Sequence, residues 1–434
     1  MTITPASQHS LDPLGPEEIL AACRLFRDLA DLPSSSRFAL VLLDEPTRRE
    51  LRDAESGAVV DRRVRLVTVD RDGGESVDGV VSLTHGTLLR RSTIDPVTQG
   101  QPPVIVEEFE EVEEIVKGDP AWRAAVRARG VTDLDLVQVD PVSAGRFELP
   151  NEPGTRIIRA VSYARCDELD NAYAHPIDGL IAYVDLTNRR ILDLVDDEVL
   201  AQPRECSNFH DHTGRPERDD LQPFDVVQPD GPSFTVDGWK VEWQRWSLRL
   251  SVNPREGLVL HQVRYRDGDR TRPVLGRASI AEMVVPYGDP RPAHFWRSAF
   301  DAGEYGLGTL MQSLALGCDC LGVIHYFDAH LADSQGQPIR VPNAVCMHEE
   351  DDGVLWRHSD IRYGGSWVRR SRRLVVSFFA TVGNYDYGFY WYFYQDGSIQ
   401  FEAKLTGIMQ TATLPAGTSS PYLSRIGPDL GAQV

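Results

Sequence analysis

The stretch TVGNYDYGFYW at residues 381–391 places one phenol between two polar side chains that favour turns. Asn384 and Asp386 flank Tyr385, and Tyr387 begins an aromatic run. Aromatic, β-branched runs are typical of a strand packed against a core, whereas asparagine and aspartate favour turns. Taken alone, the stretch favours Tyr385 as the aromatic start of a strand. The alternative is a phenol that takes part in chemistry.

A second candidate is Asp301, in the stretch FDAGEYG at residues 300–306. Aspartate close to glycine is common in turns, so on spacing alone an aspartate that caps the next segment is the favoured interpretation. The alternative is a general base, because burial beside an aromatic group raises the pKa of a carboxyl towards neutral pH.

Cysteines and histidines supply a third group of candidates. Cys318 and Cys320, with a nearby histidine such as His325 or His348, have the composition of a soft metal site. His210 and His212 have the spacing of alternate strand residues that share one ion, although they lie in a segment rich in aspartate and proline.

The composition limits the class of protein. A chain of 434 residues predicts two or three domains, and 41% apolar with 25% charged residues is ordinary for a folded protein. The formal net charge of −20 repels phosphate backbones, so we expect no nucleic-acid partner. Residues 1–14 do not resemble a secretory signal, and no apolar run is long enough to span a membrane. We therefore expect a cytoplasmic protein that does not bind membranes.

The chain predicts an α+β fold with two small N-terminal domains. In residues 1–97, a helix beginning at Pro16 carries an apolar stripe, and four strands follow at 38–43, 64–69, 77–83 and 87–89. In residues 98–205 the plan repeats. Helices at 104–117 and 121–129 precede strands at 136–139, 156–163, 180–186 and 190–195. Each domain is predicted to pack helices on an antiparallel sheet.

Residues 206–232 resemble a linker, and the strand-rich remainder, 233–434, predicts a large antiparallel β-sandwich. Predicted strands lie at 234–239, 241–250, 257–266 and 374–381, and a hairpin pairs 387–394 with 398–405 around Gln395-Asp396-Gly397. Pro415–Val434 is predicted as a polar coil. Because a sandwich does not end in this way, we expect the third domain to be incomplete.

Several segments together resemble the copper-containing amine oxidases. The motif Asn384–Tyr387 matches the diagnostic motif of that family, and further matches follow the family order. They are AHPIDGL at 174–180, AEMVVPYGDP at 281–290, FDAGEYG at 300–306, LGCDCLG at 316–322 and CMHEED at 346–351. The resemblance covers nearly the whole chain and is strongest to bacterial enzymes that oxidise phenylethylamine, tyramine or histamine. It implies that residues 1–97 and 98–205 correspond to the N2 and N3 domains of the family.

The resemblance assigns roles to individual residues. It implies that Tyr385 is converted to topaquinone, which forms a Schiff base with a primary amine, and that Asp301 abstracts the substrate proton. Tyr287 corresponds to the tyrosine that hydrogen-bonds a quinone oxygen, while Asn384 and Asp386 flank the cofactor. Ala299 occupies a position that is often an aromatic gate, so Ala299 and Phe300 are expected to line the substrate channel.

The resemblance also pairs Cys320 with Cys346 in a disulfide and makes Cys318 a buried thiol. A disulfide is unusual in a cytoplasmic protein. The pairing is nevertheless favoured over two free thiols or a metal site.

Copper is where the chain departs from the family pattern. The family binds copper through three histidines, of which a His-x-His pair follows the quinone tyrosine. Here no histidine follows His358, so we expect the chain to be truncated before the copper ligands, and we assign none of its residues as a metal ligand.

Two functions follow as expectations. The first is copper- and topaquinone-dependent oxidation of small primary amines, with arylalkyl amines as the expected substrates, by dioxygen to aldehyde, ammonia and hydrogen peroxide. The complete protein is then expected to be a homodimer, and this chain inactive as it stands. The alternative is a non-catalytic remnant that acts at most as an interaction module.

Overall fold

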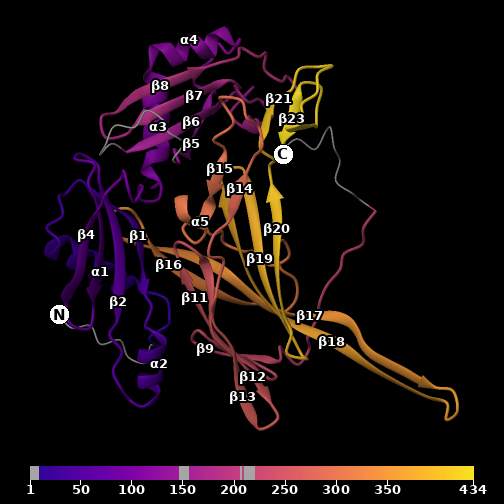
Figure 1. Ribbon diagram of the computed structural model, residues 1–434. Helices are drawn as coiled ribbons and strands as arrows, with labels where there is room; N and C mark the ends of the chain where they lie inside the picture. The colour runs from indigo at the N-terminus through magenta and orange to yellow at the C-terminus, as the bar shows by residue number, and fades with distance from the viewer. Residues whose placement is uncertain (1–8, 146–155, 206–207, 210–219) are drawn as a thin grey trace.

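A computed structural model describes residues 9–145, 156–205, 208–209 and 220–434. The fold is built mainly from antiparallel sheets with few helices (Figure 1). None of the helices within these described ranges has the length and apolar character required to cross a membrane.

The first domain packs one helix on a four-stranded sheet. The strands pair in the order β1-β2-β3-β4, with bounds Ser36–Asp44, Arg63–Asp70, Ser76–Ser82 and Thr87–Ile94. The apolar stripe predicted for the first helix is buried in α1 (Pro16–Leu29) and packs on this sheet. Gly79 in β3 lies under the ring of Phe26, where a methyl group would overlap that ring. The helix α2 (Arg48–Glu55) was not predicted.

The second domain repeats this topology. Helices α3 (Glu107–Gly118) and α4 (Pro120–Ala128) cover a sheet of order β5-β6-β7-β8, with bounds Gln138–Ser143, Ile157–Tyr163, Leu180–Asp185 and Arg190–Asp196. Asp119 caps α4 by accepting a hydrogen bond from the backbone of Trp122 at 2.8 Å. A short 3₁₀ helix, η1 (Ala172–Ala174), lies in the loop between β6 and β7.

Two five-stranded antiparallel sheets share the main core of the strand-rich part. One has the order β13-β12-β11-β10-β9, with bounds, from β9 to β13, Phe234–Asp237, Lys240–Trp243, Trp246–Asn253, Gly257–Asp267 and Arg270–Ala278. The other has the order β16-β17-β18-β19-β20, with bounds His325–Ala332, Pro338–Asp360, Gly365–Val382, Tyr385–Tyr394 and Ile399–Gly407. Their buried side chains form one cluster. The sequence predicted strands in this part but did not indicate β13, β16 or β17. The interpretation as a large β-sandwich stays a prediction.

The outer halves of β17 and β18 form an arm that projects from the body of the molecule (Figure 1). Apolar side chains on this arm are exposed, including Trp356, Ile361 and Tyr363. The inner halves of the same strands are buried and pair with β16 and β19. The arm therefore continues the strands that frame the core.

Two predictions about the strand-rich part are wrong. The strand expected at 241–250 is divided into β10 and β11 by a turn at Gln244, which has a positive φ of 53°. The polar coil expected at 415–434 contains β22 (Leu423–Arg425) and β23 (Leu430–Gln433), and β23 pairs with both β22 and β21 (Thr411–Thr413) in a small sheet. These strands have only three or four residues, too few to produce a visible alternation of polar and apolar side chains.

Candidate active site

A cavity of about 360 Å³ lies between the second domain and the strand-rich part. Its walls come from β5, β6 and η1 on one side, and from β14 (Val284–Pro286), β15 (Ser298–Phe300), α5 (Asp301–Glu304), β18 and β19 on the other. Ligand sites commonly lie at such domain boundaries. The lining contains five of the residues singled out from the sequence as site candidates: Tyr287, Ala299, Asp301, Asn384 and Tyr385.

Tyr385 begins β19 directly after the β18–β19 turn, where Gly383 takes a positive φ of 60°. Its hydroxyl contacts the hydroxyl of Tyr287 and accepts a hydrogen bond from the backbone N–H of Gln410 at 3.1 Å. Its ring stacks on that of Tyr387, with centroids 5.8 Å apart. Burial, and then the hydrogen bond with Tyr385, raise the pKa of Tyr287 far above its usual value. Tyr287 therefore stays protonated beside the hydroxyl of Tyr385, and both residues line the cavity.

The polar neighbours of Tyr385 hold the turn that presents it. The side-chain amide of Asn384 donates to the carbonyl of Ile408 at 2.6 Å. The carboxylate of Asp386 accepts from the hydroxyl of Thr381 at 2.6 Å. Asp386 is not among the residues that line the cavity. Both contacts stay within the turn and the adjoining strands, so these residues position the phenol.

Asp301 is a buried acid in the cavity wall. It is 3% exposed, and its Oδ2 has no hydrogen-bond partner among the described residues. Burial raises the pKa of its carboxyl to about 7, against an opposing hydrogen bond from Tyr387. The carboxylates of Glu304 and Glu282 add to that rise. A carboxyl with this pKa exchanges a proton near neutral pH, as a general base must.

Of the two residues expected in the substrate channel, Ala299 and Phe300, only Ala299 lines the cavity. Ala299 lies in the middle of β15. Phe300 is 44% exposed, because alternate residues of a strand face opposite sides.

The second domain supplies cavity residues that the sequence did not indicate. The hydroxyl of Tyr173 donates to Asp140 at 2.9 Å, and the side chain of Gln410 donates to the hydroxyl of Tyr163 at 3.0 Å. Burial raises the pKa of Asp140, although the hydrogen bond from Tyr173 opposes the rise. No local pattern marks these residues, because they reach the cavity only through the packing of two domains.

A buried polar group joins the second domain to the last strands of the chain. His294 Nε2 lies 2.7 Å from a carboxylate oxygen of Asp178, and Gln433 Nε2 lies 2.7 Å from His294 Nδ1. The other oxygen of Asp178 accepts from the backbone of Thr413 at 3.0 Å. Burial opposes the charge on Asp178, but the hydrogen bond with His294 and the nearby cationic side chains lower its pKa to about 2.

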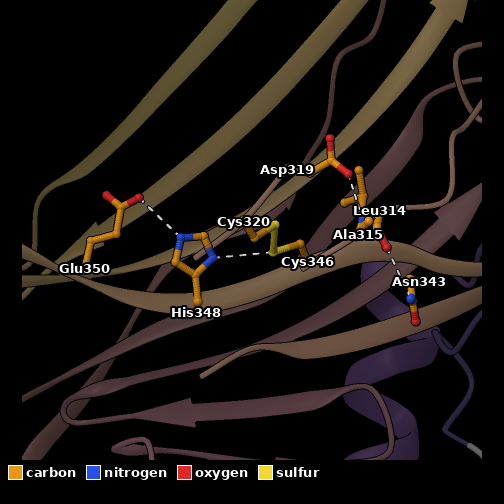
Figure 2. The surroundings of a disulfide bond; sticks show 8 residues. All are labelled: Leu314, Ala315, Asp319, Cys320, Asn343, Cys346, His348 and Glu350. Atoms are coloured by element: carbon orange, nitrogen blue, oxygen red, sulfur yellow. Dashed lines mark hydrogen bonds and ion pairs between the residues drawn. A yellow bond between two sulfur atoms is a disulfide. The ribbon is translucent and has the colours of Figure 1, made fainter. Parts of the chain in front are cut away.

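Cys320 and Cys346 form a disulfide, as expected (Figure 2). His348 lies beside it, with Nδ1 3.4 Å from the sulfur of Cys346 and Nε2 3.2 Å from Glu350. Because the disulfide engages the sulfur of Cys320, the metal site considered for Cys318 and Cys320 loses one of its two sulfur ligands. Cys318 is exposed in the short turn before Cys320, so its prediction as a buried thiol is wrong.

The described residues do not assemble a copper site beside Tyr385. Within the described ranges, two groups of side chains could bind a metal: Cys320, Cys346 and His348, and Cys166, Asp170 and His175. Neither group lines the cavity. His210 and His212 lie outside the described residues.

Comparisons with known proteins agree with the geometry. Three family models match consecutive parts of the chain: the AGAO-like N2 domain at residues 16–91, the copper amine oxidase N3 domain at 107–210 and the copper amine oxidase enzyme domain at 235–434.

Curated relatives match almost the whole chain. A histamine oxidase of Arthrobacter globiformis is 48% identical over 98% of this chain and 62% of its own length. A primary amine oxidase of Arthrobacter sp. (strain P1) is 45% identical over 95% of this chain and 63% of its own length. The chain therefore spans less than two thirds of these relatives.

A solved structure is similar as well. A copper-containing benzylamine oxidase from Hansenula polymorpha superposes with a TM-score of 0.86 at 28% identity, covering 98% of this chain and 68% of the other. The ordered domain matches, the extensive identity and the shared fold lead to one conclusion: this chain belongs to the copper amine oxidase family, on its bacterial side.

Proposed function

We propose that this chain carries the amine-binding and proton-abstracting part of a primary-amine oxidase. The overall reaction would convert RCH₂NH₂, dioxygen and water into an aldehyde, ammonia and hydrogen peroxide. The observation that supports this most directly is the pairing of Asp301 with Tyr385 in one cavity, where the acid is buried and has a pKa of about 7.

Tyr385 fits the position of a tyrosine-derived topaquinone. Its hydroxyl meets one phenol and one backbone N–H, and its ring has a stacking partner. Such a quinone supplies the electron sink that unmodified side chains lack. Tyr287 and Gln410 would hold the oxygen of residue 385, and Asn384 and Asp386 would keep the turn in place.

Asp301 is proposed as the base that takes the proton from the carbon beside the amine nitrogen. Its Oδ2 has no competing hydrogen bond among the described residues, so the oxygen is available to the substrate. Because burial raises its pKa, its ionised form is a stronger base than an exposed aspartate and is still populated at neutral pH.

Copper does not fit the residues in hand. The described residues offer no group of three imidazoles beside Tyr385, and the sequence has no histidine after His358. We therefore assign no step to copper within this chain. In the longer family members, other residues would have to bind it.

The cavity favours amines that carry an aryl group. Val285, Trp296 and Leu310 contribute apolar surface to its wall, and Ala299 leaves room where a larger side chain would intrude. We propose small arylalkyl amines as substrates and dioxygen as the second substrate. A cytoplasmic location stays a prediction.

We propose that the complete protein is a homodimer. The exposed apolar side chains of the β17–β18 arm support this, because apolar surface of this kind is commonly covered by a partner. The expected stoichiometry is two copies per particle, as measured by light scattering.

The proposed activity can be tested in a polypeptide that continues past Val434 into the C-terminal region of a relative, such as the Arthrobacter globiformis histamine oxidase. Peroxide release from phenylethylamine should depend on both Tyr385 and Asp301. Tyr385→Phe should abolish quinone staining and turnover together. Peroxide release in Tyr385→Phe at the wild-type rate would refute the proposal.

A further inference from the structure

The loop between β6 and β7 gathers three side chains of metal-binding type away from the cavity. Cys166, Asp170 and His175 place one sulfur, one carboxylate oxygen and one imidazole nitrogen within 4.8 Å of one another. Asp170 and His175 are 5% and 3% exposed, whereas Cys166 is exposed. None of the three lines the cavity.

The imidazole of His175 has a defined orientation. Its Nδ1 lies 2.7 Å from the carbonyl oxygen of Pro203. Because a carbonyl oxygen only accepts, Nδ1 must carry a proton, and Nε2 of the neutral ring then presents a lone pair. A hydrogen bond of this kind fixes the tautomer of metal-binding histidines.

That lone pair faces other electron-rich atoms. Nε2 of His175 lies 3.2 Å from Oδ2 of Asp170 and 4.0 Å from the sulfur of Cys166. Two acceptors at such a distance repel unless a positive charge lies between them. That charge is either a second proton on the imidazole or a bound metal ion.

The carboxylate of Asp170 distinguishes a second proton on His175 from a bound metal ion. Its Oδ2 already accepts from the backbone N–H of Cys166 at 2.7 Å. Its Oδ1 is buried and has no hydrogen-bond partner among the described residues. A second proton on His175 would bond only Oδ2 and bring one positive charge, whereas a divalent ion would bring two beside a buried carboxylate whose Oδ1 has no hydrogen-bond partner among the described residues.

We propose that Cys166, Asp170 and His175 bind a divalent transition-metal ion of the zinc class through sulfur, oxygen and Nε2. Thiolate and imidazole with one carboxylate are ligands that suit Zn²⁺. Bonds of about 2.0–2.3 Å in a tetrahedral arrangement separate ligand atoms by about 3.3–3.7 Å. The observed 3.2 and 4.0 Å bracket this range. On binding, the thiol releases its proton to solvent, and water takes the fourth position at the exposed side.

The ion would tie the two ends of a loop that also carries a cavity residue. Ala164 donates to the carbonyl of His175 at 2.9 Å, so the loop is already closed at its base. Tyr173, which contacts Asp140 in the cavity wall, lies two residues before His175. The proposed ion therefore has a positioning role, and the proposal does not depend on amine oxidation.

Cobalt(II) titration of the 434-residue polypeptide, purified without a polyhistidine tag, tests the site. Co²⁺ occupies zinc sites and reports a thiolate ligand through a charge-transfer band in the near ultraviolet. We expect one Co²⁺ per chain with this band, displaced by one Zn²⁺. Removing an outer-shell partner alone commonly weakens metal binding 10–100-fold, so Cys166→Ser, which removes a ligand, should weaken it by at least about 100-fold and remove the band.

Matched variants separate this site from other thiols and carboxylates. Cys318→Ser removes another exposed thiol, and Glu168→Gln removes a carboxylate of the same loop that is outside the cluster. Both should keep the band. Asp170→Asn should weaken binding, with circular dichroism to confirm folding. Absence of the band in the wild-type chain, its persistence in Cys166→Ser, or an imidazolium at His175 in excess Zn²⁺ by nitrogen NMR would each overturn the proposal.

Discussion

Asp301 sets the most specific expectation for the pH dependence of the proposed reaction. With a pKa of about 7, its ionised fraction is about a tenth at pH 6 and about nine tenths at pH 8. Only the ionised form accepts a proton, so kcat should rise about tenfold across this interval. An aspartate with an ordinary pKa of about 3.9 would be fully ionised throughout, and kcat would not change.

The assay is the pH profile of kcat in the extended polypeptide, at saturating phenylethylamine and corrected for quinone content. An α-deuterated substrate must slow turnover, which shows that proton abstraction limits the rate. Asp301→Asn keeps the shape of the side chain and should lower kcat by about two to four orders of magnitude. Quinone formation should be largely intact in this variant.

Glu304 provides a control for the cause of the raised pKa of Asp301. Its carboxylate contributes to the raised pKa of Asp301 through charge repulsion. Glu304→Gln keeps the oxygen that accepts from the backbone of Phe300, at 3.1 Å, but removes the charge. The acid limb of the profile should therefore move to lower pH. A flat profile from pH 6 to pH 8, with the isotope effect present, would refute the assignment of Asp301 as the base.

Three further expectations test other parts of the molecule. A polypeptide limited to residues 1–434 should keep Tyr385 unmodified after exposure to copper and oxygen, because no histidine follows it; a peptide mass that matches topaquinone would contradict this. Ala299→Tyr in the extended polypeptide should lower kcat/KM for bulky aryl amines more than for methylamine, because it weakens transition-state binding of the bulky amines by about 1–3 kcal/mol. Equal effects on both amines would remove Ala299 from the channel. The low pKa of Asp178 contributes about 2 kcal/mol of stability that is present above about pH 4 and lost as the pH falls towards 2. In acid titrations followed by tryptophan fluorescence, Asp178→Asn should lack this loss, and identical pH dependence in the variant and the wild type would contradict the sign.

The sequence predicted the elements whose pattern is long and regular. The apolar stripe of α1 extends over several helical turns, and the aromatic run of β19 and the alternation in β20 extend over most of each strand, so the type of these elements was clear. The helix α2 was missed because it has eight residues and buries none of them. Its signal was the capping box of Thr47 and Glu50, which marks a helix start without an apolar stripe.

The residues of the site also divide into those that a sequence pattern indicates and those that it does not. Tyr385, Asp301 and Tyr287 were located because their local motifs resemble those of a family. Asp140 and Tyr173 belong to another domain, and nothing in their neighbouring residues indicates that they face the same cavity. Their placement depends on how two cores pack, which a single sequence without its structure does not encode in any short pattern.

The β17–β18 arm separates two kinds of sequence change. Its pairing changes register between Asp351 and Trp356, whereas β18 pairs with β19 without interruption from Arg373 to Val382. An insertion or deletion near the exposed turn at 361–364 alters how far the arm reaches and leaves the ladder beside Tyr385 in place. Inserting or deleting one residue at 373–382 shifts the register of β18 against β19, the strand that begins at Tyr385, and turns the shifted side chains of β18 to the other face of the sheet. Arm length can therefore diverge among related chains while the cavity is preserved.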